Sequence, residues 1–205
     1  RKNFPDERVR QEFLKFPPKY GNDEDEVDRY GAQVTAHFCE TVRKQKGLWG
    51  MGFFAQPFTF LWLVEAGEKT GATPDGRRKG ENLAYSVSPM QGRDYKGLTA
   101  LINSLAKLPH HMAAGSTSAI IEVDPVLFND DNLDWMAILV KTAVDMGVGQ
   151  MQFNVVSAET LEKAQREPDK YRNLAVRVSG FSQRFSLLDK KLQDHIIART
   201  KHQRR

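Results

Sequence analysis

Arg177-Val178-Ser179-Gly180-Phe181-Ser182-Gln183-Arg184-Phe185 is the stretch from which the rest of the chain can be interpreted. It follows the apolar run 174–176, which predicts a short buried strand, and it precedes leucines and isoleucines at helical spacing between positions 187 and 197. Gly180 is therefore expected on a loop tip between a strand and a helix. A glycine at such a point indicates a backbone with positive φ, or the close approach of another segment.

Glycine also has a chemical property that no other residue shares. An unpaired electron on a backbone Cα is stabilised when the amide nitrogen on one side donates electron density and the carbonyl on the other side withdraws it. That delocalisation needs a planar Cα, and a side chain would clash with the flanking peptide groups in the planar form. Radical chemistry is usually delegated to a cofactor that the protein holds, and a backbone glycine can take that role itself.

The motif around Gly180, together with Gln-Asp-His-Ile-Ile-Ala-Arg-Thr at 193–200, resembles the C-terminal signature of glycyl radical enzymes. This is the superfamily of pyruvate formate-lyase and the radical diol dehydratases. Phe181 stands where tyrosine is common, which is a tolerated aromatic exchange. The resemblance extends from about Tyr20 to the end of the sequence, because further stretches match in the family's order: Ala-Thr-Pro-Asp-Gly-Arg-Arg at 72–78, Ser-Pro-Met at 88–90, Thr-Ala at 99–100 and Ser-Leu-Ala-Lys-Leu-Pro at 104–109.

The resemblance implies an α/β fold, namely part of a barrel of parallel strands with packing helices, assembled from two half-barrels. Residues 1–150 would be the C-terminal part of the barrel domain, incomplete without upstream sequence, and residues 151–205 a glycyl radical domain with the signature loop 177–185. In the family this loop stands opposite a cysteine loop. Gly180 would store the radical, and the residues expected to frame it are Arg177, Val178, Ser179, Phe181 and Ser182.

The resemblance also implies a reaction. A separate radical S-adenosylmethionine activase, which carries an iron–sulfur cluster, would remove one hydrogen from the Gly180 Cα. The glycyl radical would then take a hydrogen from a cysteine outside this chain, and the resulting thiyl would act on a small organic substrate. The motif context favours the dehydratase, decarboxylase and lyase branches over formate-lyase. The complete enzyme is expected to be a homodimer of anaerobic metabolism, cytoplasmic or in a bacterial microcompartment, with no bound cofactor and no metal.

Cys39 is the single cysteine, and it excludes an intramolecular disulfide. Its context, His-Phe-Cys-Glu-Thr in a predicted helix, lacks the Gly-Cys-Val-Glu-like loop of the family. We therefore expect a small buried hydrophobic residue. The chain begins at Arg1 without a methionine and is expected to be a piece of a longer protein.

Two other functional classes fit the sequence besides a catalytic segment. The first is a non-catalytic spare-part subunit that lends its Gly180 loop to a partner chain holding the cysteine. The second is an α/β binding domain with a chance motif. Scattered basic residues and a net charge of +4 argue against nucleic-acid binding. The most apolar stretch, 50–67, is too short and too interrupted for a membrane span.

Local patterns predict strands at 116–123 and 150–156, with helices at about 25–46, 129–147, 157–167 and 189–202. Strands that alternate with helices indicate a parallel sheet. The acidic run at 23–26 is interpreted as a helix start and not as a metal site. The helix at 25–46 is expected to bury Val27, Tyr30, Val34, Phe38 and Val42. The helix at 129–147 is expected to bury Leu133, Met136, Ala137, Leu139, Val140 and Val144.

The aromatic stretch 53–63 predicts a buried strand that leads into a helix ending near Gly67. We expect Phe54 and Gln56 from this stretch, with Asn154 and Val155 at a strand end, to face the same substrate pocket as Gly180. The alternative is that the aromatic residues are simply part of the core. Pro-Asp-Gly at 74–76 predicts a tight turn whose aspartate, Asp75, binds nearby backbone or Arg77.

Overall fold

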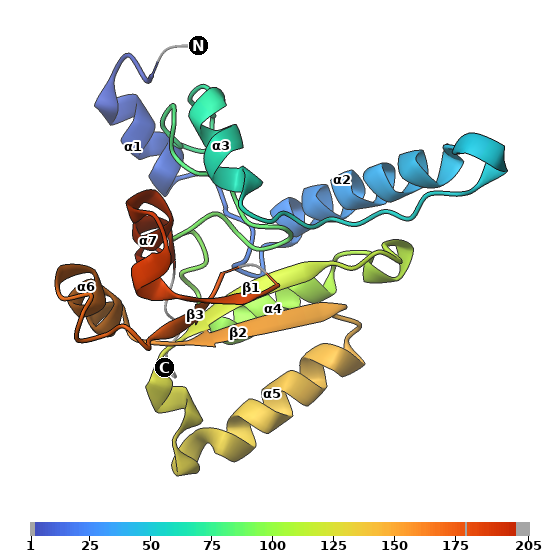
Figure 1. Cartoon of the computed structure of the whole chain (residues 1–205). Coiled ribbons are helices and arrows are strands. Elements are labelled where there is room, and N and C mark those ends of the chain that lie inside the picture. Colours follow the sequence, from blue (N-terminus) through green and yellow to red (C-terminus); the bar gives the residue numbers. More distant parts are fainter. Residues whose placement is uncertain (1–2, 179, 200–205) are drawn as a thin grey trace.

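The computed structural model describes residues 3–178 and 180–199. Strands β1 (Ser118–Val123) and β2 (Gln150–Val155) pair in parallel, and helix α5 (Leu133–Asp145) connects them (Figure 1). Parallel strands need such a crossover because the chain must return to the end of the sheet at which the first strand began before the second strand can start. The predicted α/β fold with parallel strands is confirmed. The division of the chain at residue 150 stays a prediction.

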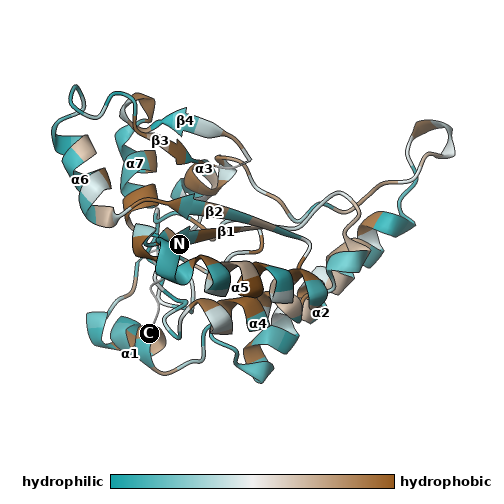
Figure 2. Ribbon diagram, turned by 90° about the horizontal axis from the view of Figure 1, so that it is seen from below, coloured by the Kyte–Doolittle hydropathy of each residue, from teal (hydrophilic) through white to brown (hydrophobic). Residues whose placement is uncertain are grey.

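The two strands present one apolar and one polar face, because successive side chains of a strand point to opposite sides. The apolar face packs against α5 and α4 (Leu98–Ala106), whose apolar stretches are brown in Figure 2. Polar side chains at Glu122, Gln152 and Asn154 occupy alternate positions on the other face. The first core includes Leu98, Leu101, Ile102, Leu105, Ile121, Val123, Met136, Leu139 and Ala143.

The predicted buried side of α5 is partly wrong. Leu133 and Val144 are exposed, whereas Ala143, which the pattern did not include, is fully buried. The buried stripe follows Met136, Leu139 and Ala143 at spacings of three and four residues, which is one narrow face of a helix.

A second core lies around an antiparallel hairpin of β3 (Ala175–Arg177) and β4 (Ser182–Arg184). Helices α6 (Ala158–Arg166) and α7 (Lys190–Ile197) contribute to it, and their N-cap residues are Ser157 and Asp189. Gly180 therefore lies at the tip of a hairpin and not on a loop between a strand and a helix, because β4 intervenes before α7. The end predicted for α7 lies outside the described residues. The members of this core are Val156, Leu161, Ala164, Val176, Val178, Phe185, Leu192 and Ile196.

Three further helices precede this body: α1 (Glu7–Lys15), α2 (Asp25–Lys44) and α3 (Trp62–Lys69). Figure 1 shows α2 extending away from the rest of the chain. The sequence predicted the bounds of α2 closely, but its expected buried face is wrong, because Tyr30, Val34 and Phe38 are 56%, 71% and 44% exposed. No helix in the described part of the chain is both long enough and apolar enough to span a membrane.

The strand predicted at 53–60 is also wrong. The segment has no regular secondary structure and pairs with no strand, and the isolated bridge between Lys46 and Gly52 lies just before it. Its aromatic content misled the prediction, because Phe53 and Phe54 lie largely in solvent. Cys39 is buried beside Ala55 and Ala113, as expected, and burial raises the pKa of its thiol.

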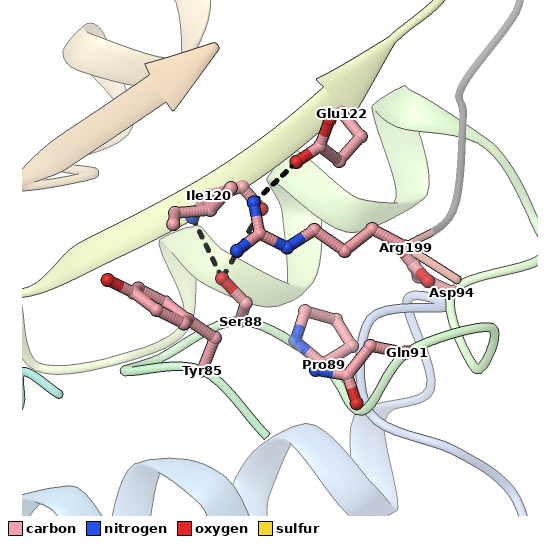
Figure 3. Close-up of a pocket in the computed structure, with 8 residues that line it drawn as sticks. All are labelled: Tyr85, Ser88, Pro89, Gln91, Asp94, Ile120, Glu122 and Arg199. Carbon is pink, nitrogen blue, oxygen red and sulfur yellow. Dashed lines mark hydrogen bonds and ion pairs between the residues drawn. The ribbon is translucent and has the colours of Figure 1, made fainter. Parts of the chain in front are cut away.

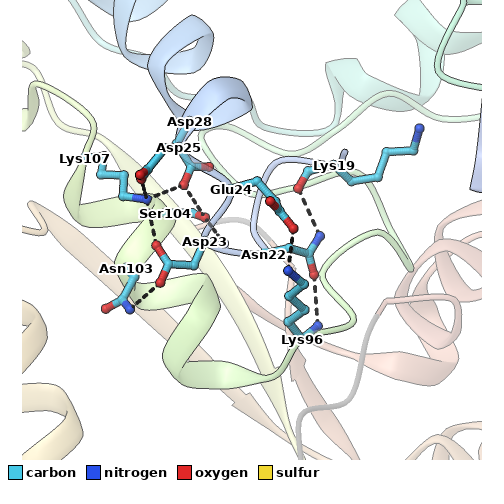
Figure 4. Close-up of polar contacts among 10 residues, drawn as sticks. All are labelled: Lys19, Asn22, Asp23, Glu24, Asp25, Asp28, Lys96, Asn103, Ser104 and Lys107. Atoms are coloured by element: carbon cyan, nitrogen blue, oxygen red, sulfur yellow. Dashed lines mark hydrogen bonds and ion pairs between the residues drawn. The ribbon is translucent and has the colours of Figure 1, made fainter. Parts of the chain in front are cut away.

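The acidic start of α2 binds a lysine. Lys107, which directly follows α4, donates to Asp23, Asp25 and the fully buried Asp28 at 2.6, 2.7 and 2.9 Å (Figure 4). This ion-pair cluster joins the start of α2 to the end of α4. No group of side chains suited to a metal ion occurs among the described residues, here or elsewhere.

The predicted turn at 74–76 is present. The Gly76 N–H donates to the Thr73 carbonyl at 3.0 Å, and Gly76 has a φ of +94°. Asp75 accepts from the Thr73 hydroxyl and not from Arg77. Arg77 is 2% exposed and donates instead to the backbone carbonyls of Thr70, Gly71 and Glu81, so this arginine holds the loop together.

Candidate functional site

Gly180 occupies the tip of the β3–β4 hairpin in a left-handed conformation with a φ of +71°. The tip is closed by a hydrogen bond from the Val178 N–H to the Phe181 carbonyl at 2.9 Å. A Cβ added at Gly180 would meet Phe58 Cζ at 3.4 Å, which is ordinary contact. The requirement for glycine in this fold therefore comes from the backbone conformation, which other L residues rarely adopt.

Aromatic rings line one side of the tip. Phe58 and Phe60 pack edge to face with ring centroids 4.8 Å apart, and Phe60 lies 6.4 Å from the ring of Phe181. The aromatic stretch thus does reach the Gly180 loop, but through Phe58 and Phe60. These rings place an apolar surface beside the glycine.

The polar face of the sheet holds the other side of the hairpin. Gln152 Oε1 accepts from the Gly180 N–H at 3.0 Å and from Arg177 Nη2 at 3.2 Å. Asn154 Oδ1 accepts from the Arg177 N–H at 3.4 Å, and Asn154 Nδ2 donates to Glu122 Oε1 at 3.1 Å. Side chains from both parallel strands therefore fix the position of the hairpin.

Arg199, which follows α7, completes this network. Its guanidinium donates to Glu122 Oε1 at 2.7 Å (Figure 3), and to the carbonyls of Arg177 and Val178 at 3.3 and 3.1 Å. One buried cation therefore connects β1, α7 and the backbone that leads into Gly180.

A small cavity of about 30 Å³ lies beside this ion pair. Arg199, Glu122 and Tyr85 contribute to its wall, and Ser88 accepts from the Ile120 N–H at 2.8 Å (Figure 3). Burial raises the pKa of Tyr85, although the nearby Arg199 acts in the opposite direction. A polar space of this size has room for an ordered water.

The residues predicted to line the pocket differ in their exposure to solvent. Asn154 is buried in the network below the hairpin, whereas Val155 is 42% exposed and Phe54 is 77% exposed. Gln56 is exposed as well. Their shared pocket with Gly180 stays a prediction. Of the residues expected to frame the loop, Arg177, Val178, Phe181 and Ser182 lie in the hairpin, and Ser179 lies outside the described residues.

Three neighbours of the loop were not predicted from the sequence: Gln152, Glu122 and Phe58. Gln152 and Asn154 are polar at alternate positions of an otherwise apolar strand, which marks one face of that strand for polar contacts. Glu122 pairs with Asn154 in the strand register. A glutamate within an apolar strand sequence was therefore the signal from which a buried polar contact could have been predicted.

Comparison with known families identifies this arrangement. Residues 83–186 match the family described as glycine radical, and residues 1–67 match the family described as pyruvate formate lyase-like. The chain belongs to the glycyl radical enzyme superfamily. The predicted superfamily is thus confirmed, and the chance-motif hypothesis is wrong.

Individual glycyl radical enzymes and related proteins agree with this assignment. A probable dehydratase, YbiW of Escherichia coli, is 37% identical over 204 residues, which are 96% of this chain and 25% of that protein. The glycerol-bound B12-independent glycerol dehydratase from Clostridium butyricum superposes with a TM-score of 0.91 at 38% identity, over 96% of this chain and 25% of that one.

Two further structures have comparable TM-scores. The structure that describes 1,2-propanediol dehydration in Roseburia inulinivorans has a TM-score of 0.92 at 38% identity, with 96% of this chain and 25% of that chain covered. Hydroxyproline dehydratase from Clostridioides difficile has a TM-score of 0.91 at 32% identity, with the same coverage of 96% and 25%. The chain thus spans about a quarter of the length of these glycyl radical enzymes, and its α/β fold is a fragment of theirs.

Proposed function

We propose that this chain is the C-terminal segment of a glycyl radical dehydratase or lyase that acts on a small hydroxylated organic substrate. The observation that carries the proposal is the placement of Gly180, at a left-handed hairpin tip between an aromatic surface and a buried polar network. The likeness to dehydratases of glycerol, propanediol and hydroxyproline supports dehydration as the reaction.

Gly180 stores the radical in this proposal. A radical S-adenosylmethionine activase with an iron–sulfur cluster removes one hydrogen atom from the Gly180 Cα. The glycyl radical then takes a hydrogen atom from a cysteine thiol, which restores the glycine and leaves a thiyl. The thiyl abstracts a hydrogen atom from the substrate, the substrate radical loses water, and the hydrogen is returned to the product.

The thiyl-forming cysteine lies outside this chain. Cys39 is 3% exposed and packs with Ala55 and Ala113. Burial raises the pKa of its thiol, so Cys39 has the character of a core residue. The complete enzyme is proposed as a cytoplasmic homodimer of anaerobic cells. The spare-part alternative requires that the cysteine loop be encoded on a different polypeptide, and the reading frame upstream of Arg1 distinguishes the two.

Anaerobic activation of the complete enzyme tests the proposal. We expect an organic radical in electron paramagnetic resonance, with a large doublet from the single α-hydrogen that remains on Gly180. Enzyme made with glycine deuterated at Cα serves as the control, and its doublet should collapse. A signal that keeps its splitting after deuteration would place the radical on another residue.

A further inference from the structure

Gln152 provides the side-chain hydrogen bond that reaches Gly180 itself. Its Oε1 accepts from the Gly180 N–H at 3.0 Å and from the Arg177 guanidinium at 3.2 Å. The other bonds from this network end on the backbone of Arg177 and Val178. Because both neighbours are donors, the amide of Gln152 must present its oxygen and not its nitrogen to them.

The buried position of Gln152 lowers the stability of the folded state unless its amide group makes specific hydrogen bonds. The side chain is 6% exposed, and its Nε2 makes no hydrogen bond within the described part of the chain. An apolar side chain of the same length would fill the space without a buried donor, but it would leave the Gly180 N–H and the Arg177 guanidinium without this acceptor. The amide oxygen is therefore the reason to keep glutamine at this point of β2.

That oxygen touches the group on which a Cα radical depends. When the Gly180 N–H donates to Gln152, electron density shifts toward the Gly180 nitrogen. The same nitrogen supplies density to an unpaired electron at the Gly180 Cα. A neutral acceptor does this without placing a charge beside the radical, and it also fixes the plane of the peptide group that precedes the Cα.

We propose that Gln152 is a positioning residue for the glycyl radical, which orients the Gly180 amide and strengthens its electron donation. This inference rests on the proposed function, because it assigns Gln152 a role only if Gly180 carries the unpaired electron. The hydrogen bond itself exists independently of activation, so it can be tested separately.

The variants are Gln152→Met, which removes the acceptor at similar length, and Gln152→Glu, which keeps it. Gln150→Met is the matched control, because Gln150 lies on the same strand, is exposed, and bonds the Ser116 hydroxyl. In the complete, unactivated enzyme, hydrogen exchange at the Gly180 amide should be about two- to tenfold faster in Gln152→Met, the range expected for one hydrogen bond. Gln152→Glu keeps an acceptor and should exchange no faster than the wild type, and Gln150→Met should exchange at the wild-type rate.

The activated enzyme gives the second measurement. The hyperfine coupling of the exchangeable Gly180 amide proton, resolved by electron–nuclear double resonance, should change in Gln152→Met and remain at its wild-type value in Gln150→Met. The same exchange rate and the same coupling in Gln152→Met as in the wild type would overturn the inference.

The experiment also decides the question if Gln152→Met does not fold or if no glycyl radical forms. If Gln152→Met does not fold, Gln152→Glu decides: a carboxylate is a stronger acceptor, so the amide coupling should shift, and an identical coupling overturns the proposal. If activated wild-type enzyme shows no glycyl signal, the proposed function fails and the assignment of Gln152 to a radical fails with it. The exchange experiment then still judges whether the hydrogen bond forms.

Discussion

Arg199 donates to the carboxylate of Glu122 at 2.7 Å across 77 positions of sequence, and the two side chains are only 6% and 2% exposed. Removing one partner of a buried pair leaves an uncompensated charge, so we expect Arg199→Met to destabilise the folded state by about 3 kcal/mol or more. Urea unfolding of the complete protein measures this. The control is Lys190→Met, which breaks an exposed pair with Asp194 and should cost less than about 1 kcal/mol. Equal losses in both variants would contradict the buried pair's role.

Gly180→Ala should abolish the radical while preserving the fold. The φ of +71° is unfavourable for alanine, and the expected loss of stability is about 1–2 kcal/mol. Gly92 has the same φ of +71° with no atom near its would-be Cβ, so Gly92→Ala is the matched control for backbone strain. Turnover and radical content should survive in Gly92→Ala and vanish in Gly180→Ala. Undiminished turnover in Gly180→Ala would refute the radical assignment.

Air exposure of the activated enzyme should break the chain at Gly180. A Cα radical couples with dioxygen, and the resulting peroxyl species fragments the backbone at that residue. Mass spectrometry should find a C-terminal fragment that starts within Gly180, retains the Gly180 carbonyl carbon and includes α7. Unactivated enzyme treated with air should stay whole. Cleavage at another glycine, such as Gly149, would move the radical away from the hairpin.

Arg77→Lys should destabilise the protein far more than the neighbouring Arg78→Lys. Arg77 is 2% exposed and donates to three backbone carbonyls, which one ammonium group cannot reach together. We expect a loss of about 2–3 kcal/mol, because at least one buried carbonyl loses its donor. Arg78 is largely exposed, and its replacement should change stability by about 0.5 kcal/mol or less. Thermal midpoints of the two variants decide the comparison.

Acid should weaken the junction between α2 and α4. Hydrogen bonds from Lys107 and then Asn103 lower the pKa of Asp23 below its usual 3.8. A lowered folded-state pKa means that the stabilisation is fully present above 3.8 and is lost as the pH falls through the lower, folded value. Urea midpoints measured between about pH 5 and pH 2 should fall less steeply in Asp23→Asn than in the wild type. Parallel curves would show that Asp23 contributes nothing to this pH dependence.

The elements that the sequence predicted well are those whose signals are local. The parallel strands have β-branched runs between turn residues, the helix predicted at 157–167 has its own apolar periodicity, and the turn at 74–76 depends on neighbouring residues. The superfamily followed from ordered motifs around Gly180. Each of these features is determined within a short window of sequence.

The wrong or missing predictions have a different cause. They depend on which distant segments pack against each element in the folded chain. The aromatic run at 53–60 has strand-like composition, but no neighbouring strand accepts its backbone hydrogen bonds. The network below Gly180 joins Glu122, Gln152 and Arg199 from distant segments. The alternation of polar and apolar residues along β2 indicated a polar face, but it could not show that the β3–β4 hairpin would pack on that face.

The outward face of α2 has a practical consequence for handling this segment. Val34 is 71% exposed, and beyond the helix Trp49 and Phe54 are 87% and 77% exposed. Large apolar side chains that are exposed along a helix and the loop that follows it are typical of an interface and promote association in water. Produced alone at high concentration, the segment should self-associate and precipitate, and replacing Val34 and Trp49 with lysine should raise its solubility without touching either core.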